Sequence, residues 1–134
     1  MTGVQTCALP ILDTAKGRPA AGLKIQLWKI EADERRLLKG VITNQDGRTE
    51  TPLLLGDELK PGVYELVFQV GPYFQNLSRR SVAEAEAAQD AFLKATEDSF
   101  LGDVPVRFRI LNPGENYHVP LLVSPWSYTT YRGS

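Results

Sequence analysis

The 134-residue sequence contains one cysteine and one histidine, and this scarcity excludes several kinds of site. Cys7 alone cannot form an internal disulfide or a cysteine-based metal site. His118 alone cannot build a histidine-rich zinc site within one chain, because such sites need three or four protein ligands. The sequence therefore predicts a protein without a metal site of these kinds.

An excess of charge and long apolar runs are also missing. Fifteen basic and 16 acidic residues give a formal net charge of −1, which provides no general attraction to nucleic acid or an anionic membrane. No apolar run approaches the roughly 20 residues that a membrane-spanning helix needs. The sequence also lacks the Gly-x-Ser-x-Gly motif of many serine hydrolases and a glycine-rich phosphate loop. We therefore expect neither nucleic acid nor a membrane as a partner.

Residues 1–11, "MTGVQTCALPI", differ from the start of a fold and from a targeting segment. They lack the basic region and the apolar stretch of a signal peptide. The string matches the translation of a common short-read sequencing adapter, so we predict that it is a non-native scar. The alternative is an unusual but genuine N-terminus. We expect a cytoplasmic protein, with the periplasm as the alternative because a signal peptide would have been lost with the native start.

From Leu12 onward, the sequence is a series of short strand patterns separated by turns. Apolar and polar residues alternate in several of them, as in half-buried strands, and Tyr64, Leu66, Phe68 and Val70 would share one face. The predicted strands include residues 23–30, 37–44, 63–70, 104–111, 117–124 and 127–132. A charged hairpin connection is expected at 31–36 and an Asp-Gly turn at 44–48. Seven or eight such strands predict one all-β domain over residues 12–134, a two-sheet antiparallel sandwich.

One segment, at about 78–98, interrupts the strand rhythm. It is rich in alanine and acidic residues and contains neither glycine nor proline. Ser78 or Ser81 can cap a helix, and Glu84 completes a capping box with Ser81. The pattern predicts one extended helical insert, with the helix over about 79–97, as a solvated surface element without catalytic groups.

The lone histidine lies in the segment "YHVPLLVS", where the alternation places His118 opposite the core face. Pro120 and Leu122 share its outward side. An apolar outward face that carries an imidazole suits a subunit contact or the floor of a cleft, and imidazole can exchange protons near neutral pH. From the pattern alone, a structural histidine held by hydrogen bonds is the favoured interpretation, and a proton-transfer role is the alternative.

Two further groups could contact a small polar molecule. Arg48 follows Asp46-Gly47 and reads as a solvated turn residue when taken alone, although a guanidinium can bind a carbonyl oxygen or an anionic heterocycle. The chain ends in Tyr131-Arg132-Gly133-Ser134, which offers a phenol, a cation, a hydroxyl and a carboxylate. The strand pattern runs almost to the last residue, so we expect a tail that is held in place rather than frayed.

Together these segments resemble the transthyretin-related 5-hydroxyisourate hydrolases. The matching stretches are "LDTAKGRPAAGLKIQLWKI", "TNQDGRT", "PGVYELVFQVGPYF", "FLGDVPVRFRI" and "YHVPLLVSPWSYTTYRGS". The terminal "YRGS" is the most specific, since in this family it separates the hydrolases from hormone carriers of the same fold. The resemblance implies a transthyretin-like sandwich, a homotetramer with its sites in a central channel, and ring opening of 5-hydroxyisourate in urate degradation without a cofactor.

The resemblance also implies roles for individual residues. Arg48, His118 and Ser134 match the catalytic positions, and Arg48, His118 and residues 131–133 match the substrate-binding positions. The binding positions in the tail are Tyr131, Arg132 and Gly133. The family's N-terminal histidine has no counterpart, because Pro10 occupies its position, so we predict that the chain is impaired as a catalyst. A transthyretin-like small-ligand binding protein without catalysis is the alternative, and a damaged gene copy is a third interpretation.

Overall fold

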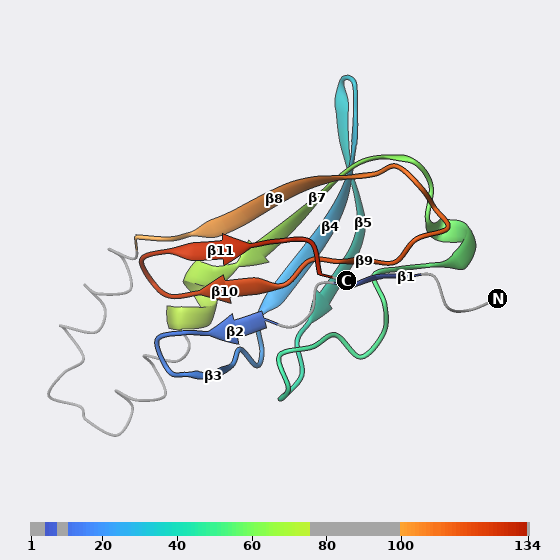
Figure 1. Ribbon diagram of the computed structural model, residues 1–134. Helices are drawn as coiled ribbons and strands as arrows, with labels where there is room; N and C mark the ends of the chain where they lie inside the picture. The colour runs from blue at the N-terminus through green and yellow to red at the C-terminus, as the bar shows by residue number, and fades with distance from the viewer. Residues whose placement is uncertain (1–4, 8–10, 76–99, 134) are drawn as a thin grey trace, which may run out of the picture.

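The computed structural model describes residues 5–7, 11–75 and 100–133, which form a sandwich of two β-layers (Figure 1). One layer is a sheet with the strand order β5-β4-β7-β8. Its strands are β4 (Lys24–Glu31), β5 (Glu34–Ile42), β7 (Gly62–Gln69) and β8 (Asp103–Ile110). All three pairings in this sheet are antiparallel. The predicted all-β sandwich is confirmed.

The other layer contains two short sheets, β11-β10-β2-β3 and β6-β1-β9. Their strands are β1 (Gln5–Cys7), β2 (Ile11–Asp13), β3 (Arg18–Pro19), β6 (Leu54–Leu55), β9 (Tyr117–His118), β10 (Leu121–Val123) and β11 (Tyr128–Thr130). A short 3-10 helix, η1 (Gly56–Glu58), follows β6. Only two residues separate β9 from β10, so one stretch of chain runs through both short sheets. Strand β1 lies within the segment predicted to be a scar; its pairing uses main-chain groups, and the foreign origin stays a prediction.

The core lies between the two layers, as the alternation predicts. Ile25 and Leu27 of β4, Phe68 of β7, and Leu121 and Val123 of β10 are fully buried. They belong to a single hydrophobic cluster that joins both layers. Burying a side chain of this size contributes roughly 1.5–3 kcal/mol, so this contact supplies the main force that holds the sandwich together.

The start and the end of the chain are joined by parallel strand pairing. Ile11 of β2 pairs with Leu121 of β10, and β1 pairs with β9 in the same sense. The backbone N–H of Thr14 also donates to the carbonyl of Val123 over 2.9 Å. The other pairings among the described strands are antiparallel. The strand that carries His118 is therefore anchored to the N-terminal part of the domain.

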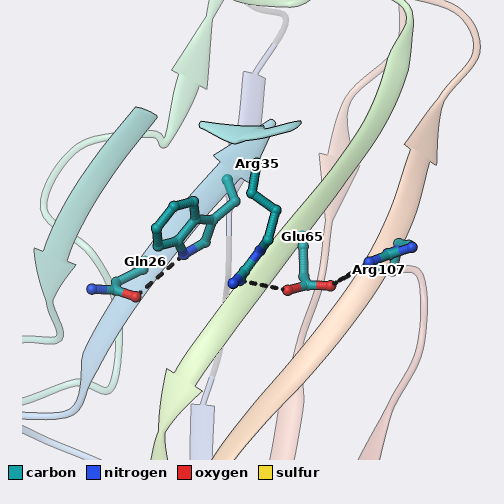
Figure 2. Close-up of polar contacts among 5 residues, drawn as sticks. Gln26, Arg35, Glu65 and Arg107 are labelled. Carbon is teal, nitrogen blue, oxygen red and sulfur yellow. Dashed lines mark hydrogen bonds and ion pairs between the residues drawn. The ribbon is translucent and has the colours of Figure 1, made fainter. Parts of the chain in front are cut away.

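The hairpin between β4 and β5 is tighter than predicted, and it projects beyond the body of the sandwich (Figure 1). The strands pair as far as Glu31 and Glu34, so only residues 32 and 33 connect them. The expected connection at 31–36 is therefore too long. Glu65 explains the difference: it lies between Arg35 and Arg107, at 2.8 and 3.1 Å (Figure 2). Arg35 also stacks on the indole of Trp28. These contacts keep a charged residue in the strand.

The segment after β7 begins with a helical turn that the alternation missed. The alternation predicts that Val70 extends the strand, but β7 ends at Gln69 and residues 70–75 are helical. Pro72 fits here because the first turn of a helix does not need its missing N–H. The helix predicted over 79–97 lies outside the described residues. Among the residues that are described, no helix is long and apolar enough to cross a membrane.

Candidate active site

His118 lies on the outer side of the β9–β10 stretch, as the alternation predicts. The residues on the opposite side are buried in the core; they are Tyr117, Val119, Leu121 and Val123. The imidazole is half-buried, and its Nε2 atom is shielded from solvent. Within the described part of the chain, Nε2 has no hydrogen-bond partner. These residues therefore do not supply the hydrogen bond to Nε2 that a purely structural histidine would use there.

The C-terminal tail is held against the strand that carries His118. The hydroxyl of Thr130 donates to the carbonyl of Pro120 over 2.6 Å. Three residues further on, the N–H of Gly133 donates to the carbonyl of His118 over 2.8 Å, and the two residues form an antiparallel bridge. The chain end accordingly lies beside β9 (Figure 1). The expectation of a tail that is held in place is confirmed for the described residues.

Gly133 allows an unusually close approach to the histidine. A Cβ atom at this position would lie 3.1 Å from Cβ of His118 and 3.4 Å from Cγ of Pro120. The first distance is shorter than most contacts of a real Cβ atom. The backbone of Gly133 therefore covers one side of His118 at a distance that other residues reach only if a neighbour moves.

A cavity of about 270 Å³ adjoins this contact. His118, Tyr131 and Arg132 are among its lining residues, together with Phe108 of β8 and Thr130 of β11. The cavity thus lies between β8, the edge strand of one layer, and β11, an edge strand of the other. Three of the residues predicted from the sequence come together around one hollow, whose largely apolar walls are typical of a small-molecule pocket.

The guanidinium of Arg132 is engaged within the protein. It donates to the carbonyl of Asn116 over 3.2 Å and lies 3.6 Å from the carboxylate of Glu115. Its carbon Cζ also lies 4.5 Å from the ring centroid of Tyr117. The sequence pattern assigns no role in the site to Glu115, Asn116 or Tyr117. The one signal in the sequence is that Tyr117 closely follows the Asn-Pro-Gly sequence at 112–114, which places the ring near a turn.

Arg48 is exposed and does not belong to the residues that line this cavity. Its turn is nevertheless fixed to the same layer, because the N–H of Ile11 donates to the carbonyl of Gly47 over 3.1 Å. Gly47 has a φ of 70° and no room for a Cβ atom, which explains the glycine in "DGR". The next residue, Thr49, has a buried hydroxyl without a partner in the described part of the chain.

The remaining predicted positions cannot be placed, because Pro10 and Ser134 lie outside the described residues. Within the described residues, no group of three or more histidine, cysteine, aspartate or glutamate side chains could hold a metal ion. The candidate site therefore consists of an imidazole, a covering tail, an adjoining cavity and an arginine turn on the same layer.

The fold and the site define a transthyretin-type sandwich whose C-terminal tail lies on a strand histidine. The chain belongs to the HIUase/Transthyretin family, whose model matches residues 7–133. A 5-hydroxyisourate hydrolase 2 from Rhizobium meliloti (strain 1021) is 47% identical over 124 residues, which cover 92% of each chain. A 5-hydroxyisourate hydrolase from Deinococcus radiodurans is 40% identical over 134 residues and is matched over the full length of both chains.

Solved structures show the same fold. The crystal structure of (S)-allantoin synthase matches with a TM-score of 0.77 and 39% identity, over 97% of this chain and 43% of that longer chain. Sea bream transthyretin in complex with thyroxine matches with a TM-score of 0.72 and 23% identity, over 97% of this chain and 93% of that one. At this lower identity, the likeness to transthyretin shows the fold alone.

Proposed function

We propose that this chain hydrolyses 5-hydroxyisourate, the reaction for which its close relatives are named. The observation that carries the proposal is the pairing of Gly133 with His118. This pairing brings the terminal "YRGS" sequence, which the resemblance connects with the hydrolases, next to the only imidazole in the chain. A carrier of apolar ligands has little use for either group.

In the proposed reaction, water attacks a ring carbonyl of the substrate and the ring C–N bond breaks. His118 and a second imidazole, at the position that Pro10 occupies here, orient the water, accept its proton and return a proton to the ring nitrogen as the C–N bond breaks. Arg48 holds the heterocycle and stabilises negative charge on the carbonyl oxygen, since a preorganised cation acts strongly on developing charge. The tail residues Tyr131 and Ser134 shape the pocket around the substrate.

The site is completed in a homotetramer under this proposal. Within one chain, Arg48 does not line the cavity beside His118. His118 itself lies on the outer face of its layer. We propose that the outer faces of these layers meet between copies and form a channel over His118. Among the described strands, β8 and β11 each end a sheet, and we propose that these edges also pair with a second copy. Light scattering should give a mass of four chains.

The direct test follows the absorbance of freshly generated 5-hydroxyisourate in the ultraviolet. Addition of the chain is expected to accelerate the decay above the spontaneous rate, weakly for the sequence as given and strongly once a histidine occupies position 10. The rival function, a small-ligand binding protein, predicts saturable binding of the substrate with no acceleration in either case. Binding without turnover would replace the proposed hydrolase by this rival.

Substituting Gly133 with alanine is expected to lower the turnover rate about tenfold or more, because displacement of a catalytic group by a fraction of an ångström is costly. The added methyl would lie 3.1 Å from Cβ of His118, so the tail or the imidazole must move. The matched control is Gly40→Ala on β5, where nothing lies within 4 Å of the new atom. Turnover that is equal in both variants would contradict the close contact as a requirement for activity.

A further inference from the structure

We propose that the turn between β8 and β9 clamps Arg132, so that Arg132, Glu115 and Tyr117 act as positioning residues for the active site. The clamp would hold the tail at a fixed place on His118. This inference rests on the proposed function in one respect, namely that the contact between the tail and His118 belongs to the catalytic site. It assigns Arg132 a task other than the substrate binding that the family resemblance implies.

Arg132 makes three separate contacts with this turn. The guanidinium donates to the Asn116 carbonyl, approaches the Glu115 carboxylate and covers the ring of Tyr117. A guanidinium is flat and offers hydrogen-bond donors around its edge, so it can stack on a ring and bind oxygens at the same time. All three contacts lie within the protein, and together they orient the side chain toward the turn.

The turn itself is rigid enough to act as a platform. The hydroxyl of Tyr117 accepts hydrogen bonds from the N–H groups of Leu111 and Asn112, at 3.1 and 2.9 Å, and donates to the Asn112 carbonyl. The side chain of Asn112 accepts from the N–H of Gly114 over 2.8 Å. Tyr117 is only 5% exposed. These hydrogen bonds and this burial hold the ring in its orientation, and Arg132 stacks on the ring so held.

The clamp and the site are joined through neighbouring residues. Tyr117 precedes His118, and Arg132 precedes Gly133. A cation–π contact joins Arg132 to Tyr117, and a 2.8 Å hydrogen bond joins the N–H of Gly133 to the carbonyl of His118. Two consecutive residues of the tail are thus attached to two consecutive residues of β9. Two attachments fix both the position and the direction of the tail, whereas the hydrogen bond alone would leave it free to pivot.

The contacts differ in how much they contribute. Arg132 and Glu115 have side chains that are 56% and 46% exposed, and their atoms are 3.6 Å apart. Exposed ion pairs of this kind contribute little, about 0–1 kcal/mol. The planar guanidinium stacks on the ring and donates to the Asn116 carbonyl at the same time, whereas the compact ammonium of lysine has no flat face with which to hold both contacts together. Arg132→Lys should therefore disturb the tail although it keeps the charge, and Glu115→Gln should disturb it less.

The first test uses the fact that His118 is the only histidine of the chain. In the untagged protein, the imidazole gives a single set of ring-proton resonances, which report on its surroundings without any assay of activity. We expect these resonances to shift in Arg132→Lys and to shift less in Glu115→Gln. The matched control, Arg36→Lys at an exposed position on β5, should leave them unchanged. Resonances in Arg132→Lys that equal those of the parent chain would overturn the clamp.

The second test separates positioning from substrate binding, in the chain as given or with histidine at position 10, whichever turns over. A misplaced site is expected to lower kcat up to about 100-fold in Arg132→Lys, with little change in KM. Loss of the exposed ion pair in Glu115→Gln should lower kcat by at most about fivefold. A raised KM with unchanged kcat in Arg132→Lys would instead identify a substrate-binding arginine. If neither parent chain turns over, the proposed function fails, and the resonance experiment still decides whether the clamp exists.

Discussion

Replacing Pro10 with histidine is expected to raise the rate of 5-hydroxyisourate hydrolysis by about 10²- to 10⁴-fold, the usual contribution of one general acid or base. The proposed reaction uses two imidazoles, and the chain contains one. Position 10 comes directly before β2, and the first residue of β2, Ile11, pairs with Leu121 three residues beyond His118. Residue 10 itself lies outside the described residues, and we propose that a histidine there acts on the same water molecule as His118.

The experiment compares the chain as given, the Pro10→His variant and a Pro10→Ala variant in the ultraviolet decay assay. The alanine variant removes the proline ring without adding an imidazole, so it should remain as slow as the parent chain. Equal activity before and after the change to histidine would show that position 10 does not carry the missing group. A gain in both variants would attribute the effect to release of the proline rather than to proton transfer.

Replacing His118 with alanine in the Pro10→His chain should lower turnover by about 10²- to 10⁴-fold. The chain should keep its melting temperature and its oligomeric mass, because His118 is only half-buried and its Nε2 atom has no partner among the described residues. Removal of the ring therefore leaves no described hydrogen-bonding group unpaired. The result would assign the chemistry to this residue rather than to the fold.

Added imidazole provides the control for this second experiment. The cavity beside His118 measures about 270 Å³, so a free imidazole can enter the space that the truncated side chain leaves and restore part of the rate. Unchanged turnover in His118→Ala would exclude the histidine from the reaction. Loss of the oligomer together with activity would identify a structural residue instead.

The alternation of apolar residues predicts most strands, because it reports directly which side chains face the core. It places β8 (Asp103–Ile110) and the inner face of the β9–β10 stretch correctly. It fails where a contact from another strand decides the local structure. Arg35 remains in β5 because Glu65, 30 positions further along, binds it. Val70 leaves the strand pattern because a helical turn begins there, although its side chain is as buried as a strand residue would be.

The candidate site could be predicted only in part. Sequence motifs indicate which residue types it contains, but contacts between residues far apart in the sequence decide how those residues are arranged. The resemblance carried by "TNQDGRT" and "YRGS" indicates the residue types, and the structure brings His118, Tyr131 and Arg132 to one cavity. No pattern in the sequence reveals that Arg132 stacks on Tyr117. The roles of Arg48 and Ser134 stay predictions, since one does not line the cavity and the other lies outside the described residues.

The parallel pairing of β2 with β10 has a consequence for how the chain folds. Thr14 binds Val123 across a separation of 109 residues, so the layer cannot close until the ribosome has made the chain at least as far as Val123. Contacts of such long range slow folding, because a large loop must close before they form. Until then, the edge of β2 that β10 will cover has no strand partner, which is the condition under which nascent chains associate with one another.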